Sequence, residues 1–366
     1  MALDFNSLRR VMLDATRACV VPGGIVAVGD KGKPVFLEAF GYRQLVPERE
    51  PAMPDGVYDL ASLTKALVTA PLAMVAVDRG LVGLDSEAGT VFSSLSDQPG
   101  VTLRRLLSHS AGFPAHRRFF EAWPSTDPPT EAMRETMVSM AASHPLAYAP
   151  GTQSIYSDLG FILLGAWLEK IFGDRLDRLA DRIWFSPLGL KSLRFPGGSP
   201  FPPDAVIAPT EDCPSRKVMV SGEVHDLNAR AMGGIAGHAG LFGSAADVLG
   251  MALELSKAFH GRGAGIVQSS TVRTFFSPQG IPGSTWRLGF DGPSAQGSLA
   301  GDRITRSAVG HLAFTGCSFW MDPATGTCVV FLCNRVHPVV HDDPRFRVLR
   351  RDVNDAALAA IGYGAS

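Results

Sequence analysis

The sequence predicts an α+β protein in which one sheet is built from both ends of the chain and a mainly helical domain is inserted between them. β-rich runs occur near the N-terminus and again in the last third, whereas residues 84–240 read as helices and long Pro/Gly loops. Helical patterns also open and close the chain. The predicted boundaries are 1–60 and 235–366 for the sheet domain and 61–234 for the helical domain.

The first third of the chain supplies three predicted elements. They are an amphipathic helix over 5–18, a hairpin of strands 24–28 and 35–40, and a nearly all-apolar helix over 60–80. The hairpin is indicated by the turn sequence Gly29-Asp30-Lys31-Gly32 between its strands. Gly80 ends the apolar helix, and Pro71 inside it should kink or split it, because proline has no N–H to donate.

The remaining elements follow the same signals. They are a second apolar helix over 159–172, a Gly/Pro/Ser loop over 195–203, short strands over 307–314, 318–321 and 328–334, and a closing helix over 345–361. The loops 112–130 and 196–224 are expected to form pocket walls. Their side chains cannot be positioned from periodicity.

Charge and composition exclude several classes of protein. The 366 residues carry 34 Lys and Arg against 35 Asp and Glu, a net charge of −1, so no nucleic-acid partner is expected. The longest uncharged apolar-rich run, Ala66–Val77, is too short for a membrane span, which needs about 20 residues. No basic segment followed by an apolar core is present near Met1, and five cysteines suit a reducing compartment. We therefore expect a cytoplasmic protein, or a periplasmic one if the native N-terminus was trimmed.

The first chemical motif is the S-x-x-K sequence Ser62-Leu63-Thr64-Lys65. On a helix, residues i and i+3 share a face, so Lys65 can reach the Ser62 hydroxyl. A lysine on an apolar helix is expected to be desolvated, which lowers its pKa and makes a neutral amine accessible as a base. The alternative is a helix-capping serine beside a lysine that extends to solvent.

Two further segments carry candidate groups. Tyr156 precedes the helix that begins near Leu159, and a neighbouring ammonium such as that of Lys65 should make its phenol easier to ionise. His311 stands at a strand end before a turn, where a strand N–H can bind an oxyanion. Taken alone, the Tyr156 segment is better explained as a partly buried tyrosine, and the alternative for the His311 segment is an ordinary hairpin.

The motifs together resemble the penicillin-recognising serine hydrolases, in the branch related to class C β-lactamases that includes esterases, D-aminopeptidases and D,D-peptidases. The order Ser-x-x-Lys, Tyr-Ser-x and a C-terminal strand motif is the order in that family. Residues 106–112 resemble its "LLTHTSG" stretch, residues 233–242 its "GGVAGHAGLF" stretch, and residues 310–322 its "GHTGFTGTSLWID" stretch. The likeness runs over nearly the whole chain.

The resemblance implies a role for each matching residue. Ser62 would be the acylated nucleophile, with Lys65 and Tyr156 sharing the general-base work. The backbone N–H groups of Ser62 and Phe314 would form the oxyanion hole. The implied fold is an antiparallel sheet flanked by the terminal helices, with the active site in a groove between this sheet and the helical domain.

The chain departs from the family pattern at two places. Asp158 stands where the family often has an asparagine, so this side chain should hold the Lys65 ammonium well and bind an amide carbonyl poorly. His311-Leu312-Ala313 replaces a Lys-Thr-Gly or His-Thr-Gly triplet, which leaves His311 at the cationic position without the neighbouring hydroxyl. A second register, over 314–316, would place Cys317 at the oxyanion hole instead. Both departures favour esters or small amides over penicillins and D-Ala-D-Ala.

The sequence thus predicts a serine hydrolase that forms a covalent acyl-enzyme with a small-molecule ester, amide or β-lactam, without a metal or cofactor. One alternative is a β-lactamase or D-Ala-D-Ala peptidase, and another is a catalytically impaired binding module of the same fold. The oligomeric state is not predicted.

Overall fold

A computed structural model describes residues 3–123, 130–214 and 216–364. Its helices are α1 Asn6–Arg17, α2 Ala70–Asp78, α3 Leu103–Leu107, α4 Glu131–Ala142, α5 Asp158–Phe172, α6 Leu176–Ala180, α7 Ser186–Leu188, α8 Leu227–Ala231, α9 Ala245–Phe259, α10 Ser269–Phe276 and α11 Arg345–Ala360. Its strands are β1 Gly23–Asp30, β2 Lys33–Gln44, β3 Glu50–Pro51, β4 Val57–Asp59, β5 Asp212–Cys213, β6 Val218–Met219, β7 Phe242–Ser244, β8 Val309–Leu312, β9 Ser318–Asp322 and β10 Thr327–Leu332.

Both ends of the chain build one antiparallel sheet of six strands, in the order β3-β2-β1-β10-β9-β8. At its centre β1 pairs with β10, so that Ile25 lies opposite Leu332. Both central strands are almost fully buried, which explains their continuous runs of apolar residues. The predicted fold class, an antiparallel sheet assembled from the two ends of the chain, is therefore confirmed.

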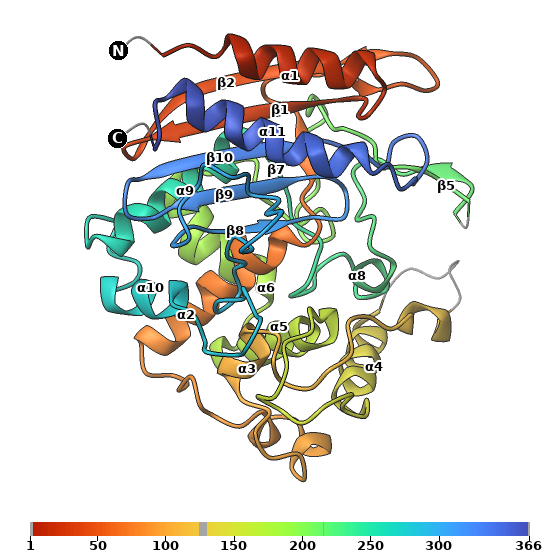
Figure 1. Ribbon diagram of the computed structural model, residues 1–366. Coiled ribbons are helices and arrows are strands. Elements are labelled where there is room, and N and C mark those ends of the chain that lie inside the picture. The colour runs from red at the N-terminus through yellow and green to blue at the C-terminus, as the bar shows by residue number, and fades with distance from the viewer. Residues whose placement is uncertain (1–2, 124–129, 215, 365–366) are drawn as a thin grey trace.

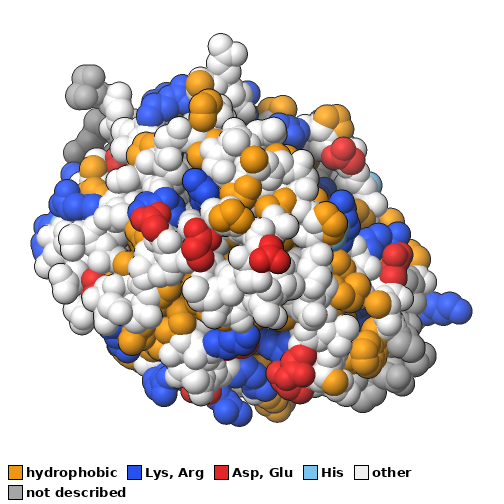
Figure 2. All heavy atoms as spheres, turned by 90° about the horizontal axis from the view of Figure 1, so that it is seen from below, with side chains coloured by type: hydrophobic (Ala, Val, Ile, Leu, Met, Phe, Trp, Pro, Cys, Tyr) orange, Lys and Arg blue, Asp and Glu red, His pale blue; other side chains and the backbone are white. Residues whose placement is uncertain are grey.

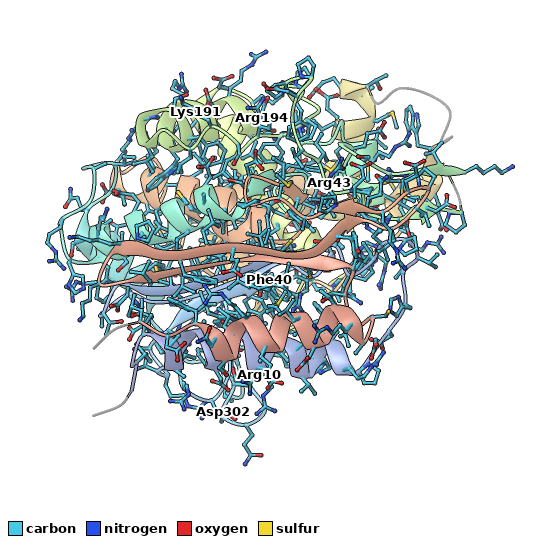
Figure 3. All side chains as sticks on the ribbon, turned by 90° about the horizontal axis from the view of Figure 1, so that it is seen from above. Arg10, Phe40, Arg43, Lys191, Arg194 and Asp302 are labelled. Atoms are coloured by element: carbon cyan, nitrogen blue, oxygen red, sulfur yellow. The ribbon has the colours of Figure 1, made fainter. Side chains whose placement is uncertain are left out.

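Helices cover both faces of this sheet. The terminal helices α1 and α11 lie side by side on one face (Figures 1 and 3), where Phe40 of β2 belongs to the hydrophobic cluster beneath them. Helix α9 packs against β1 and β10 on the other face, toward the mainly helical part of the chain. The edge strand β8 carries His311 and faces that helical part.

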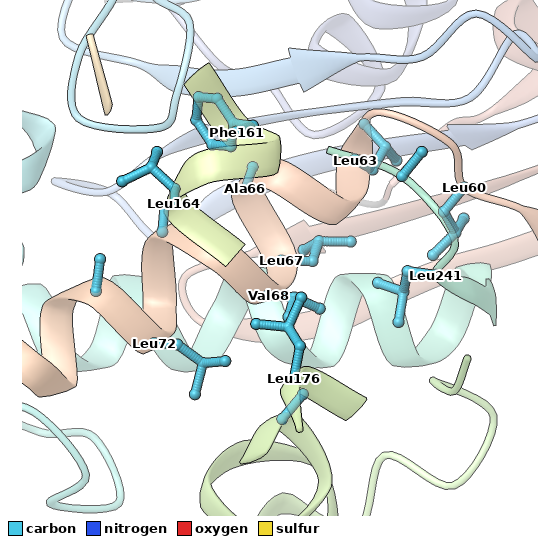
Figure 4. Close-up of a cluster of buried hydrophobic side chains, with 14 of the residues drawn as sticks. Leu60, Leu63, Ala66, Leu67, Val68, Leu72, Phe161, Leu164, Leu176 and Leu241 are labelled. Atoms are coloured by element: carbon cyan, nitrogen blue, oxygen red, sulfur yellow. The ribbon is translucent and has the colours of Figure 1, made fainter. Parts of the chain in front are cut away.

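The segment predicted as a single helix over 60–80 is divided into two parts. A π-helical turn covers Lys65–Thr69, and the regular helix α2 follows, with Pro71 in its first turn. Proline has no N–H to donate to the preceding turn, and the loss of such a hydrogen bond is a known cause of irregularity within a helical segment. The segment packs deep in the larger core cluster, where Figure 4 shows Leu67 and Val68 in the same cluster as Leu176.

The distribution of charged side chains on the surface is consistent with the net charge of −1. On the face seen in Figure 2, acidic and basic side chains are interspersed with uncharged ones. Within the described ranges, no helix is long and apolar enough to cross a membrane.

The proposed domain boundaries at residues 60 and 235 stay a prediction.

Candidate active site

Ser62 lies on a tight turn between β4 and the buried helical segment. Ala61, directly before it, has a left-handed backbone conformation with φ of 43°, which is strained for a residue other than glycine. The buried Asp59 carboxylate holds this turn by accepting hydrogen bonds from the N–H of Ala61 and from the N–H of His225, both at 2.8 Å. The strained turn presents the Ser62 side chain to a cavity.

The structure brings the three predicted catalytic side chains together. Lys65 Nζ donates to Ser62 Oγ at 3.2 Å, and the Tyr156 hydroxyl donates to the same oxygen at 2.8 Å. Lys65 is fully buried, and its Nζ also donates to Asp158 Oδ1 at 2.8 Å and to the carbonyl oxygen of His238 at 2.9 Å. Three acceptors match the three protons of an ammonium group.

The expectation that burial lowers the pKa of Lys65 is wrong in its net direction. Burial does lower this pKa, but the charges of Asp158 and Tyr156 and their hydrogen bonds raise it by more, so the pKa lies above its usual value. Burial alone would raise the pKa of Asp158, yet Lys65 and His116 hold it well below its usual range. The resting site therefore contains a Lys65–Asp158 ion pair and no neutral amine.

Tyr156 likewise differs from the expectation of an easily ionised phenol. Burial raises its pKa, and the Lys65 ammonium offsets only part of that rise. Its ring stacks on Trp286 and contacts the ring of His109, with ring centroids 5.4 and 4.7 Å away. The resting Tyr156 is therefore a neutral phenol in a rigid aromatic setting.

His311 is brought to the cavity, but it is not a cation. Its side chain is buried, and this burial lowers its pKa to about 3. A neutral imidazole follows, with Nδ1 donating to the carbonyl oxygen of Leu312 at 2.8 Å. Its Nε2 has no hydrogen-bond partner in the described part of the chain. The predicted cationic position is therefore occupied by a neutral hydrogen-bond acceptor.

Phe314, which the resemblance makes the second oxyanion donor, follows strand β8 by two residues. Phe314 lines the same cavity as Ser62. No described residue accepts a hydrogen bond from the backbone N–H of Ser62 or from that of Phe314. Arg335 Nε donates to the carbonyl oxygen of Phe314 at 2.9 Å, and the ring of Phe314 contacts both the Arg335 guanidinium and the ring of His225. These contacts hold the peptide that carries the Phe314 N–H.

The alternative register over 314–316 does not fit this geometry. The Thr315 hydroxyl donates to the carbonyl oxygen of Asp59 at 2.8 Å, away from the cavity lining. Cys317 is buried with its Sγ against carbonyl oxygens, and burial raises the pKa of its thiol. Cys317 is therefore a small core residue.

The cavity lined by Ser62, Tyr156, Asp158, His311 and Phe314 has a volume of about 640 Å³. As expected, the loops 112–130 and 196–224 contribute walls, although residues 124–129 and 215 lie outside the described residues. Four carboxylates line the cavity, and among the described residues no Arg or Lys does: the acids are Asp158, Glu211, Asp226 and Asp291. The described residues also contain no group of three or more His, Cys, Asp or Glu side chains suited to a metal ion.

Several site residues were not predicted from the sequence. Trp286, Glu211 and Asp226 lie in loops without a recognisable motif, and only the fold brings them to Ser62. His238 does belong to a quoted motif, and its ring Nε2 lies 3.0 Å from Asp226 Oδ1 while its carbonyl oxygen accepts from Lys65. His116 follows the 106–112 motif closely, but no spacing rule connects it to Asp158.

Comparison with known proteins agrees with this fold and site. The sequence model of the family "Beta-lactamase" matches residues 8–353. The chain is 27% identical to an N-acetylmuramyl-L-alanine amidase of Bacillus subtilis (strain 168), over 95% of this chain and 85% of that protein. It is 29% identical to a "Putative D-alanyl-D-alanine carboxypeptidase" of Escherichia coli O157:H7, over 78% of this chain and 70% of that protein.

Solved structures show the same fold. EstCE1, a hydrolase with promiscuous acyltransferase activity, superimposes with a TM-score of 0.73 at 21% identity, covering 96% of this chain and 97% of that one. Simvastatin synthase (LovD) from Aspergillus terreus superimposes with a TM-score of 0.72 at 19% identity, covering 98% of each chain. The fold and the Ser62 site thus define a serine hydrolase of the acyl-enzyme type. The chain belongs to the beta-lactamase family.

Proposed function

We propose that this serine hydrolase cleaves neutral esters and small amides through an acyl-enzyme on Ser62. The observation that carries the proposal is the charge of the cavity, whose described lining holds four carboxylates against three histidines, of which His311 is neutral, and no Arg or Lys. Lys65, the nearby ammonium, already has three protein acceptors. A substrate without a carboxylate suits this lining.

The proposed chemistry begins with removal of one proton from the Lys65–Tyr156 pair. Ser62 Oγ accepts hydrogen bonds from both groups, so it needs one of them deprotonated before it can give up its own proton. Ser62 then attacks the carbonyl carbon, and the oxyanion lies between the N–H groups of Ser62 and Phe314. Loss of one such donor typically lowers the rate about 10²–10³-fold.

The same cavity disfavours a D-Ala-D-Ala peptidase. The C-terminal carboxylate of that peptide would be placed among like charges, and Leu312 offers no hydroxyl to bind it. Like charges juxtaposed in a binding site oppose association. A cytoplasmic location, away from cell-wall peptides, is part of this proposal.

The test combines labelling with turnover. The protein is incubated with a fluorophosphonate, the labelled peptide is mapped by mass spectrometry, and hydrolysis of p-nitrophenyl acetate and butyrate is compared with that of a chromogenic cephalosporin and a D-Ala-D-Ala peptide. Labelling at Ser62 and faster turnover of the esters are expected, and Ser62→Ala should abolish both while the protein stays folded. Persistent turnover in that variant would contradict the assignment.

The comparison also separates the other functions. Faster hydrolysis of the cephalosporin or the peptide would favour the β-lactamase or peptidase. A stable adduct at Ser62 without turnover would favour the binding module.

A further inference from the structure

His116 lies beside the catalytic groups although no motif includes it. Its Nδ1 is 3.2 Å from Asp158 Oδ2, while the other oxygen of Asp158 holds Lys65. The side chain lines the cavity and is 43% exposed, and no described residue forms a hydrogen bond with its second nitrogen, Nε2. Asp158 thus joins Lys65 on the buried side to His116 on the cavity side.

The backbone around His116 is fixed from both sides. The carbonyl oxygen of Ala115 accepts from the N–H of Asp158 at 2.8 Å. The carbonyl oxygen of Arg117 accepts from Asn228 Nδ2 at 2.7 Å. His116 is therefore positioned relative to Asp158 by the main chain as well as by its own ring.

The charges around His116 favour its protonated form. The hydrogen bond to Asp158 raises the pKa of His116, burial lowers it by less, and the charges of Asp158 and Asp226 add to the rise against that of Lys65. A histidine whose pKa is raised in this way is protonated in part of the protein molecules near neutral pH.

We propose that His116 is an acid–base residue of this hydrolase, oriented by Asp158, that gives a proton to the leaving group and later takes one from water. The inference rests on the proposed function at Ser62. A carboxylate that receives Nδ1–H fixes the ring and leaves Nε2 for proton transfer, as in other acid–base histidines. Tyr156 and Lys65 both donate hydrogen bonds to Ser62 Oγ, and we assign to them the transfer of the Ser62 hydroxyl proton.

The protons balance over one cycle. In acylation, the Ser62 Oγ–carbon bond forms, the Ser62 proton passes to the deprotonated Lys65–Tyr156 pair, the bond to the leaving group breaks, and that group takes the proton from His116 Nε2. In deacylation, water adds to the acyl carbon and gives a proton to His116. The bond to Ser62 Oγ then breaks, and this oxygen regains its proton from Tyr156 or Lys65.

The test measures how the rate depends on the leaving group. His116→Asn and His116→Gln are assayed with esters of one acid whose leaving groups range from p-nitrophenol to simple alcohols. The matched control is His144→Asn, because His144 accepts a hydrogen bond from the side chain of Arg117, the residue next to His116, but does not line the cavity. Fluorophosphonate labelling of Ser62 is measured in parallel, since fluoride leaves without needing a proton.

The expected result is a loss that grows as the leaving group becomes more basic. We expect kcat/KM for alkyl esters to fall about 10²-fold or more, a typical contribution of general acid catalysis, while labelling by the fluorophosphonate keeps nearly its normal rate. The control should behave like the unmodified protein.

An equal loss for all leaving groups, or none, would overturn the role of His116. Failure of the unmodified protein to label at Ser62 would instead overturn the proposed function, so the two failures are distinguishable.

Discussion

Lys65 and Asp158 form a buried ion pair 2.8 Å long beside Ser62, and this pair sets the charge of the site. Burial raises the pKa of Tyr156 and Asp158 adds to that rise, while Asp158 also raises the pKa of Lys65 against the effect of burial, so the resting enzyme keeps both groups protonated. The base needed for acylation is formed only when Lys65 and Tyr156, whose titrations are coupled, have lost one proton between them. The ion pair therefore controls the pH at which the enzyme becomes active.

The first prediction concerns the pH profile. In the unmodified protein, kcat/KM for p-nitrophenyl acetate should rise with pH above neutrality, since both pKa values are raised. Asp158→Asn removes the carboxylate that raises them, so the rising limb should shift to lower pH. Stopped-time assays across the pH range measure this. Asp85→Asn, which breaks an exposed ion pair with Arg104, serves as the control. If the rising limb of the pH profile stayed in place or moved to higher pH in Asp158→Asn, Asp158 would not be the group that raises these pKa values.

The second prediction concerns Tyr156. Tyr156→Phe removes the hydroxyl that donates to Ser62 Oγ but keeps the ring in contact with those of His109 and Trp286. We expect kcat/KM to fall about 10²–10⁴-fold, the usual contribution of a general acid–base group, with little change in thermal stability. Steady-state kinetics and a melting curve measure the two quantities. A loss smaller than about tenfold would assign the proton transfer to another group.

The third prediction concerns the peptide that carries the Phe314 N–H. Arg335→Ala removes both the hydrogen bond to the carbonyl oxygen of Phe314 and the cation over its ring. We expect kcat to fall while KM stays nearly constant, by less than the roughly 10²–10³-fold loss of a complete oxyanion donor. Arg351→Ala, which breaks an exposed pair with Asp302, is the control. A change confined to KM would show that this arginine contacts substrate instead.

The fourth prediction concerns stability. Leu67 is fully buried in the core that supports the Ser62 turn. Leu67→Ala should lower the free energy of unfolding by about 2–5 kcal/mol, through lost burial and a residual cavity. Leu37→Ala, on an exposed part of β2, should change it by less than about 0.5 kcal/mol. Urea titrations compare the two, and similar losses would contradict the assignment of the core.

Sequence patterns predicted the parts of this protein that depend on local order. The apolar runs of β1 and β10 and the spacing of Ser62 and Lys65 follow from periodicity, and the structure has both features. The charge states of Lys65 and His311 were predicted wrongly, because a pKa depends on neighbours that only the fold supplies. Loop residues such as Trp286 were missed for the same reason.

The pairing of β1 with β10 has a consequence for the order of folding. Ile25 and Leu332 meet across the centre of the sheet although the chain between them is about 300 residues long, and contacts of such separation form late and slowly. During synthesis, the edge of β1 that faces away from β2 stays unpaired until β10 has been synthesised. Until then that edge is able to pair with strands of other molecules. A chain cut short before β10 would therefore lack the middle of its sheet, even if every residue around Ser62 were already present.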